Sequence, residues 1–358
     1  MQTCNVHLIR FKTTDPDNKV KSRLKKLFHK AGFDKIIGKN DLTALKVHFG
    51  EKGNNTFLPP AYIEPIVRMV KSLGAKPFVT DTNVLYKSAR DNAVDHITLA
   101  HEHGFSLKTI GAPIIISDGI AGRNEIEIRI DAPINKSVSL AVDLVTANSL
   151  IVISHVTGHI NIGLAATIKN MGMGMASRKG KLTQHSVSKP MINQNKCTAC
   201  GTCAEWCPEN AINVGSNFAT INETICIGCG ECIAVCRFSA VKFKWDNSSI
   251  ELQKQVAEHA LGIVKQKKGK IGFFTFLINM TKDCDCFGVK SKPIIDDIGV
   301  LAGKDPVAID QAVLDLTKIN NKDISELSYP NVNANTQLIY GEKIGLGSRG
   351  YKLIDEEI

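Results

Sequence analysis

The sequence is poor in aromatic residues and contains no long hydrophobic run. Aromatic side chains make up 6% of the 358 residues, and no basic stretch is interleaved with them. A dedicated nucleic-acid-binding module usually carries such a stretch, so we expect no nucleic-acid partner. Apolar runs such as Ile151–Ile153 and Phe273–Ile278 are far shorter than the roughly 20 residues of a membrane-spanning helix. They are typical of buried strands, and we expect no membrane insertion.

The N-terminal segment Met1–Thr14 also lacks the hydrophobic stretch of a signal peptide. This predicts a cytoplasmic protein, in which the 11 cysteines would be thiols or metal ligands rather than disulfides. The 44 basic residues outnumber the 35 acidic ones, for a formal net charge of +9. That excess fits a solvated lysine-rich surface, or a docking surface for an acidic partner or a nucleotide.

Eight of the cysteines form two copies of the motif C-x2-C-x2-C-x3-C, and a shift of 29 residues places the first copy on the second. Iron in a [4Fe–4S] cluster is bound by deprotonated thiols. The close spacing lets three sulfurs of one loop face the same cluster, while the fourth comes from the other copy. We therefore predict two [4Fe–4S] clusters, one held by Cys197, Cys200, Cys203 and Cys236, the other by Cys226, Cys229, Cys232 and Cys207.

Two structural zinc sites are the alternative interpretation of these cysteines. Zinc is usually bound by two C-x2-C pairs separated by a longer stretch, which is not the pattern here. Pro208, directly after Cys207, further favours iron–sulfur ligation, although Arg237 takes the equivalent place after Cys236. A cluster pair predicts electron transfer, but cluster potentials span roughly −700 to +450 mV, so the sequence does not define the direction of electron flow.

Outside the cysteine-rich segment, helical and strand patterns alternate along the chain. The predicted strands are Thr43–Phe49, Lys76–Thr80, Ile114–Ser117, Leu150–Ser154 and Ile271–Ile278. Predicted helices include one beginning at Pro59-Pro60, Ser137–Ala147, Glu251–Lys265 and one capped by Asp305-Pro306. This alternation predicts an α/β fold with a mainly parallel sheet and flanking helices, interrupted by a small ferredoxin-like α+β module. The expected domains are residues 1–189 with 246–358, and an insert at 190–245.

Chemically capable side chains follow three of the predicted strands, where parallel sheets bind their ligands. Lys46 and His48 end the first of these strands, Asp81 follows the second, and His155 and His159 follow the third. A single histidine at a strand end more often makes a structural hydrogen bond, but several such ends in one sheet predict a site. His155 and His159 have the spacing of a helical metal-binding pair, yet the preceding strand and Gly158 favour a loop.

Two further segments carry candidate binding residues. In the first, Lys169, Asn170, Gly172 and Gly174 could bring a cation and backbone amides to an anion or cofactor. The alternative is a tight helix-to-loop turn with buried methionines, and the segment matches neither a Walker A loop nor a dinucleotide fingerprint. In the second, Cys284 and Cys286 could chelate a metal with Cys4 or a histidine, or be two buried thiols, whereas Cys4 alone is expected to be structural.

With these motifs in place, the chain resembles the domain-of-unknown-function 362 family of iron–sulfur proteins. The resemblance extends over nearly the whole chain, including the double cysteine motif. It implies a ferredoxin-like or 4Fe–4S protein and leaves the substrate open. The matching segments are Lys46–Asn54, Val79–Asn83, Ser154–His159, Ile168–Gly174, Gly180–Ser186, Lys282–Cys286 and Asp297–Ala312.

The favoured functional hypothesis is a redox enzyme, an oxidoreductase whose clusters pass electrons to a substrate or metal site in the α/β domain. A redox partner protein or small carrier would supply the electrons. The histidines would donate protons or bind metal, Lys169 would hold a small anionic substrate, and Asp81 would orient a substrate or a histidine. The alternative is a non-catalytic electron-transfer protein that docks to a larger redox complex. A third hypothesis, a redox or oxygen sensor, lacks any helix-turn-helix or basic stripe to support it.

Overall fold

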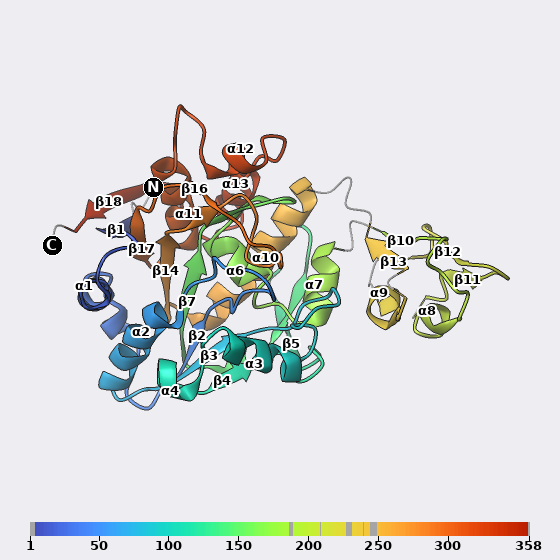
Figure 1. Ribbon diagram of the computed structural model, residues 1–358, viewed down its shortest axis with the longest axis horizontal. Helices are drawn as coiled ribbons and strands as arrows, with labels where there is room; N and C mark the ends of the chain where they lie inside the picture. Colours follow the sequence, from blue (N-terminus) through green and yellow to red (C-terminus); the bar gives the residue numbers. More distant parts are fainter. Residues whose placement is uncertain are drawn as a thin grey trace.

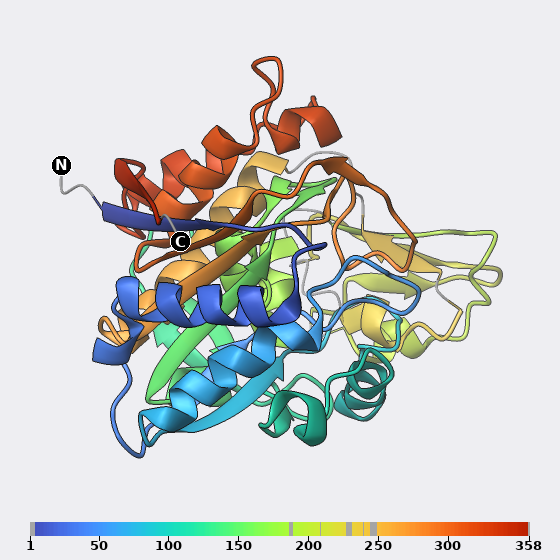
Figure 2. The same ribbon diagram turned by 60° about the vertical axis from the view of Figure 1, so that its left-hand side comes forward.

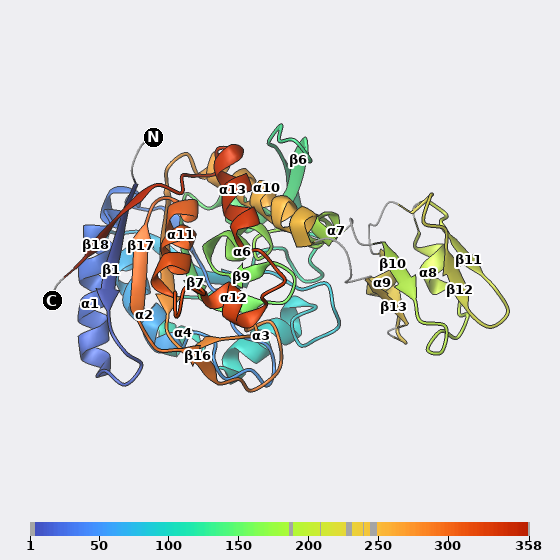
Figure 3. The same cartoon turned by 90° about the horizontal axis from the view of Figure 1, so that it is seen from above.

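The computed structural model describes residues 4–185, 189–207, 209–226, 231–238, 240–243 and 249–356 (Figure 1). These residues form a large lobe built on one sheet and a small cysteine-rich lobe. Figures 1 and 3 both show the small lobe set apart from the large one, beyond the helices α7 (Arg178–His185) and α10 (Ser249–Lys267).

The large lobe contains an eight-stranded sheet. Every strand in it runs in one direction except β17, which is antiparallel to both of its neighbours. The prediction of an α/β fold with a mainly parallel sheet is therefore confirmed. In spatial order the strands are β18 (Tyr351–Asp355), β1 (Cys4–Arg10), β17 (Gly299–Gly303), β14 (Ile271–Leu277), β7 (Ser149–His155), β2 (Leu42–Lys46), β3 (Lys76–Asp81) and β4 (Ile114–Ile116).

Helices cover both faces of this sheet, and Figure 2 shows the blue α1 and α2 in front of it, with the gold α10 behind. One face carries α1 (Asp17–Lys30), the short 3-10 helix η1 (Phe33–Lys35), α2 (Pro60–Ser72), α3 (Ala93–Glu102) and α4 (Leu107–Ile110). The other face carries α5 (Val142–Thr146), α6 (Thr167–Gly172), α10, α11 (Pro306–Leu316), α12 (Ile324–Ser328) and α13 (Asn335–Lys343).

The central strand β7 shows why the sheet is covered on both sides. Leu150 and Val152 pack into the core beneath α6 and α10, whereas Ile151 and Ile153 pack into the core beneath α1 and α2. All four are buried, as expected for a parallel strand whose alternating side chains both face helices. The continuous apolar run that predicted this strand is thus explained by its central position in the sheet.

Three hairpins extend from the large lobe: β5 (Glu125–Arg129) with β6 (Ser137–Ala141), β8 (Thr157–His159) with β9 (Gly163–Ala165), and β15 (Met280–Thr281) with β16 (Pro293–Ile295). The predicted helix over Ser137–Ala147 is wrong, because its first half is strand β6 and only Val142–Thr146 is helical. Val138 and Leu140 alternate with serines, and the pairing with β5 turns both toward α10, where they surround Gly262. The alternation of apolar and polar side chains expected of a strand therefore describes this segment better than the helical pattern does.

The predicted helix starts at prolines are confirmed. Pro59 is the N-cap residue of α2, which begins at Pro60. Asp305 caps α11, where its Oδ1 accepts hydrogen bonds of 2.9 Å from the amides of Val307 and Ala308. Both starts depend only on local chain chemistry, which makes them readable from the sequence.

The small lobe contains β10 (Pro190–Ile192), α8 (Thr202–Glu205), β11 (Ile212–Val214), β12 (Ala219–Ile221), α9 (Glu231–Val235) and β13 (Val241–Phe243). Its strands form two antiparallel pairs, β10 with β13 and β11 with β12. Ile212, Ala219 and Val241 form its small core together with Cys203 and Cys232. A search of the described helices finds none with the length and apolar character to cross a membrane.

Gly172 at the end of α6 is required for close packing against α10. A Cβ atom added there would lie 2.0 Å from the carbonyl oxygen of Val256, a backbone atom of α10. We expect Gly172→Ala to destabilise the fold by about 1–3 kcal/mol, because the two helices must separate. The shift of the urea midpoint measures this.

Gly350→Ala is the matched control for that experiment. The nearest atom to its added Cβ would be the Ser348 hydroxyl at 3.6 Å, which is ordinary contact, so we expect a change below about 0.5 kcal/mol. Equal midpoints for the two variants would contradict the packing role of Gly172.

Candidate functional site

The candidate site lies where parallel strands β2, β3, β7 and β14 reach their carboxyl ends. Lys46, Asp81 and His155 are the last residues of the first three strands. Because these strands are parallel neighbours, their ends meet at one edge of the sheet. The loop after β14 and the helix α6 contribute the remaining side chains of the site.

Lys46 and Asp81 form a fully buried ion pair. Lys46 Nζ lies 2.9 Å from Asp81 Oδ1, and the two side chains are 0% and 3% exposed. The Lys46 ammonium also donates to Asn170 Oδ1 at 2.8 Å. Burial alone would raise the pKa of Asp81, but the charge of Lys46 and a contact from His96 hold that pKa well below its usual range. Asp81 thus lies between two buried groups, with Lys46 Nζ at 2.9 Å and His96 Nε2 at 3.7 Å from its carboxylate oxygens.

His155 is held in the protonated state by two acceptors. Its Nδ1 donates to Asp285 Oδ2 at 2.6 Å and its Nε2 donates to the carbonyl oxygen of Ile278 at 2.7 Å. Burial opposes the charge, yet Asp285 and the carbonyl outweigh it and raise the pKa of His155. Thr56 donates to the other oxygen of Asp285 at 2.9 Å. The imidazolium of His155 thus anchors the loop that carries Asp285.

His48 lies beside a buried arginine that the sequence reasoning missed. Strand β2 ends at Lys46, three residues before the predicted end at Phe49, so His48 belongs to the following loop. Arg90, 2% exposed, places Nη1 2.9 Å from His48 Nε2 and donates through Nε to Glu51 at 3.0 Å. Burial and the charge of Arg90 lower the pKa of His48 well below its usual value. A neutral His48 is therefore a hydrogen-bond acceptor here.

Cys284 and Cys286 lie together beneath Lys169. Lys169 Nζ is 3.2 Å from Cys284 Sγ and 4.0 Å from Cys286 Sγ. A hydrogen bond from Cys286 and the charge of the Lys169 ammonium outweigh the opposing effect of burial, and together they lower the pKa of Cys284 to about 5. The same hydrogen bond and burial raise the pKa of Cys286, so the pair is one thiolate and one thiol.

His159 completes a group of three ligand-type side chains. One nitrogen of its ring and the sulfurs of Cys284 and Cys286 all lie within 4.8 Å of one another. His155 and His159 do not act as a pair, because His155 is occupied by Asp285 and Ile278. Cys4 lies elsewhere, with its sulfur 3.4 Å from Asp305, and burial together with Asp305 raises its pKa to about 11. The sequence left Cys4 or a histidine as the third ligand beside Cys284 and Cys286. In the structure a histidine, His159, lies next to the two thiols, and Cys4 does not.

The predicted anion-binding segment around Lys169 is largely engaged with the protein itself. Asn170 binds Lys46 and also donates to Ile153 O and Ser154 Oγ, each at 3.0 Å. Gly172 faces α10, and Gly174 passes over Lys46, whose Nζ would lie 3.0 Å from an added Cβ. The glycines therefore allow close packing around the candidate site. Lys169 is the member of the segment that contacts the thiols of Cys284 and Cys286.

A second buried lysine, Lys181 on α7, was also missed. Its Nζ donates to Thr82 Oγ1 at 2.7 Å and to the carbonyl oxygen of Ala176 at 2.6 Å. Burial lowers its pKa to about 8, although the nearby Asp118 acts in the opposite direction. Lys181 lies in Gly180–Ser186, one of the segments that carry the family resemblance, but only its contacts in the fold show that its ammonium is buried.

Five of the described cysteines lie in or against the core of the small lobe, whereas Cys200 is exposed. Burial and the neighbouring Cys197 and Cys200 sulfurs raise the pKa of Cys203, and Cys236 from the second motif contributes to the same shift. Backbone amides donate to three of the sulfurs, those of Cys197, Cys207 and Cys236, at 3.2–3.4 Å. Cys229 and Pro208 lie outside the described residues.

The end of helix α7, which precedes the small lobe in the chain, lies close to the candidate site. His185, at the end of α7, lies close enough to Lys169 that the lysine charge contributes to lowering its pKa to about 4, after burial. The chain enters the small lobe shortly beyond His185, at β10. The two lobes also contact each other directly, where the guanidinium of Arg123 lies 5.6 Å from the ring centre of Trp206. The candidate site therefore lies next to the connection between the lobes.

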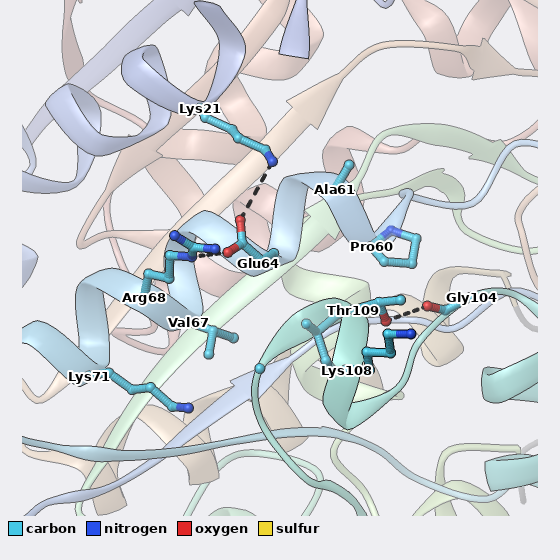
Figure 4. Close-up of a pocket in the computed structure, with 12 residues that line it drawn as sticks. Lys21, Pro60, Ala61, Glu64, Val67, Arg68, Lys71, Gly104, Lys108 and Thr109 are labelled. Atoms are coloured by element: carbon cyan, nitrogen blue, oxygen red, sulfur yellow. Dashed lines mark hydrogen bonds and ion pairs between the residues drawn. The ribbon is translucent and has the colours of Figure 1, made fainter. Parts of the chain in front are cut away.

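A separate hollow lies between α1, α2 and α4 (Figure 4). It measures about 580 Å³ and is lined by four cationic side chains, Lys21, Arg68, Lys71 and Lys108. Figure 4 shows Glu64 between Lys21 and Arg68, and its carboxylate is paired with both. None of the predicted site residues lines this hollow.

Comparison with known proteins places the chain in a family without assigning it an activity. A family model described as Domain of unknown function (DUF362) matches residues 43–315, and this description names no cofactor. No curated protein matches the chain.

Two solved structures show distant similarity. A crystal structure of a structural-genomics target from Thermotoga maritima has a TM-score of 0.43 at 9% identity, over 87% of this chain and 59% of that one. The lactate racemase apoprotein from Thermoanaerobacterium thermosaccharolyticum has a TM-score of 0.39 at 10% identity, over 84% and 54%. The chain thus spans less than two thirds of either protein. The family match covers most of the present sequence, and the chain belongs to the DUF362 family.

Proposed function

We propose that the protein is an iron–sulfur redox protein in which two [4Fe–4S] clusters pass electrons to the strand-end site of the large lobe. The clusters would occupy residues 190–245, inserted into an α/β domain of residues 1–189 and 246–358. The electrons would come from a redox partner protein or a small carrier. The observation that carries the proposal is a two-fold repeat, in the small lobe, of both the cysteine motif and the strands around it.

The repeat extends well beyond the cysteines. Moving 29 positions along the chain places strand β10 on β12 and strand β11 on β13, with identical lengths. The first strand of each half pairs with the second strand of the other half. Two halves interlocked in this way bring the fourth cysteine of each motif toward the other motif, as crossed cluster ligation requires.

The surroundings of the sulfurs support the same assignment. Besides burial, the charges of Cys197, Cys200 and Cys236 raise the pKa of Cys203, and these four cysteines are the set predicted for one cluster. The amides of Ala211 and Ala240 donate to Cys207 and Cys236 at 3.2 and 3.3 Å, in equivalent positions of the two halves. Amide hydrogen bonds to ligand sulfurs stabilise a negatively charged cluster and adjust its potential.

The candidate site supplies what an electron acceptor would need. Lys169 provides a positive charge for a small anionic substrate, beside the thiol of Cys286 and the ring of His159. Burial and the charge of Lys169 lower the pKa of His185, which ends the last helix before the small lobe. A protein that only carries electrons to a larger complex does not need a group of buried charged side chains and thiols at the strand ends of its large lobe. For this reason we favour an oxidoreductase over that alternative.

Metal and sulfide analysis of anaerobically purified protein tests the proposal. We expect about eight irons and about eight acid-labile sulfides per chain, because each cluster contains four of each. Reduction with dithionite should bleach the cluster absorption and produce the electron paramagnetic resonance signal of reduced [4Fe–4S] clusters. Zinc at the small lobe with no acid-labile sulfide would contradict the proposal and favour structural zinc sites.

A further inference from the structure

We propose that His159, Cys284 and Cys286 bind a single divalent metal ion through one imidazole nitrogen and two thiolates. The proposed function treats this region only as the destination of electrons, and the metal site would exist whether or not the clusters are present. Its three ligand atoms already lie within 4.8 Å of one another. Among the residues that the structure describes, they form the one such group of three or more histidine, cysteine or carboxylate side chains.

The ligand spacing is close to that of a mononuclear site. With metal–sulfur distances of about 2.3 Å and tetrahedral angles, two sulfurs bound to one zinc ion lie roughly 3.8 Å apart. Binding would therefore draw the three ligands together by about 1 Å at most, which side-chain rotations can provide. Three protein ligands leave a fourth position open, which is the arrangement of catalytic rather than structural zinc.

Two segments distant in sequence are fixed against each other at this point. Gly158 lets strand β8 lie against the next segment so closely that an added Cβ would be 2.3 Å from the carbonyl oxygen of Lys282. The loop that follows Lys282 is anchored through Asp283, which binds the Tyr329 hydroxyl, and through Asp285, which binds His155. The ligands are therefore held in place by neighbours on either side of Cys284, as metal sites usually require.

Charge and ligand type indicate which metals the site would accept. The charges of two thiolates and one divalent ion sum to zero. The positive charge of the Lys169 ammonium, 3.2 Å from Cys284 Sγ, would therefore remain uncompensated beside the open position. A small anion could then bind there. One imidazole and two thiolates suit ions of borderline softness such as Zn²⁺, Fe²⁺, Co²⁺ and Ni²⁺ rather than Mg²⁺ or Ca²⁺.

Zinc binding by the full-length, cluster-loaded protein tests this inference. Protein is purified without oxygen, treated with a mild chelator and titrated with Zn²⁺, and both zinc and iron are counted. We expect one tightly bound zinc per chain, and zinc-edge X-ray absorption should show two sulfur neighbours and at least one nitrogen or oxygen neighbour. In C284S/C286S the zinc affinity should fall by at least about tenfold while the iron content stays unchanged.

Cys4→Ser is the matched control, because it removes a partly buried thiol that contacts Asp305 instead. It should keep the zinc, and His159→Gln should weaken binding with fewer nitrogen neighbours. Failure of the wild-type protein to retain zinc, or equal retention by C284S/C286S, would overturn the inference. A low iron content with a normal zinc site would instead contradict only the proposed cluster function.

Discussion

Removing Cys236 together with the first three cysteines of the other motif should leave one cluster intact. We expect the variant with alanine at Cys197, Cys200, Cys203 and Cys236 to retain about four irons per chain. Its remaining set, Cys207 with the second motif, still provides four thiolates for a single [4Fe–4S] cluster. The crosswise pairing of the strands is the structural reason for expecting the distant Cys236 in the first set.

A companion variant makes this test decisive. Alanine at Cys197, Cys200, Cys203 and Cys207 removes the four cysteines of one contiguous motif. Crossed ligation predicts that it retains no complete cluster, because the second motif would lack its fourth ligand. Iron and sulfide counts separate the two cases, and loss of the magnetic interaction between two reduced clusters provides a second measurement.

The opposite pattern, about four irons in the companion variant and none in the first, would show that each motif holds its own cluster. Cys4→Ala should retain the full iron content, because Cys4 lies in the large lobe against Asp305. That control separates loss of a ligand from loss of a thiol in general.

Breaking the Lys46–Asp81 pair should produce the largest loss of stability among single substitutions at the site. Asp81→Asn keeps the shape of the side chain but removes its negative charge. The Lys46 ammonium, which is 0% exposed, then has no carboxylate partner and keeps the hydrogen bond to Asn170 Oδ1. Removing one partner of a buried ion pair typically costs about 3–5 kcal/mol. The shift of the urea or thermal midpoint, measured on cluster-loaded protein, would show it.

An exposed ion pair in the same lobe provides the control. Arg129 and Asp131 lie 2.9 Å apart, but their side chains are 82% and 53% exposed. We expect Asp131→Asn to leave the unfolding midpoint nearly unchanged, because water screens and replaces the interaction. The double variant K46M/D81L should recover much of the loss, since no charge remains buried. A small effect of Asp81→Asn, equal to that of Asp131→Asn, would mean that water reaches the pair.

Several expectations about the fold followed from local chemistry and were met. Asp305 before Pro306 could be predicted as a helix cap, because the cap involves amides only two and three residues away. The apolar run at β7 is explained by two covered faces. The helix predicted over Ser137–Ala147 was wrong for the opposite reason, because a hairpin partner outside the segment determined its conformation.

The candidate site shows where local reasoning stops. His48, Asp81, His155 and Lys169 were selected because strands or glycines preceded or followed them, and the structure brings them to one sheet edge. Their partners could not be read from the chain. Lys169 contacts Cys284, 115 positions away, and His155 contacts Asp285, 130 positions away. Arg90 contacts Glu51 and His48, which are 39 and 42 positions away.

The sequence by itself determined the alternation of helices and strands, the repeated cysteine spacing and the helix caps, because each depends on residues within a few positions of one another. Only the tertiary structure decided that His159 joins Cys284 and Cys286, that Cys4 does not, and that Lys46 is neutralised by Asp81. Those contacts arise where parallel strands end side by side and Gly158 and Gly172 let neighbouring segments pack closely. Such contacts depend on the order of strands in the sheet, which spacing along the chain does not specify.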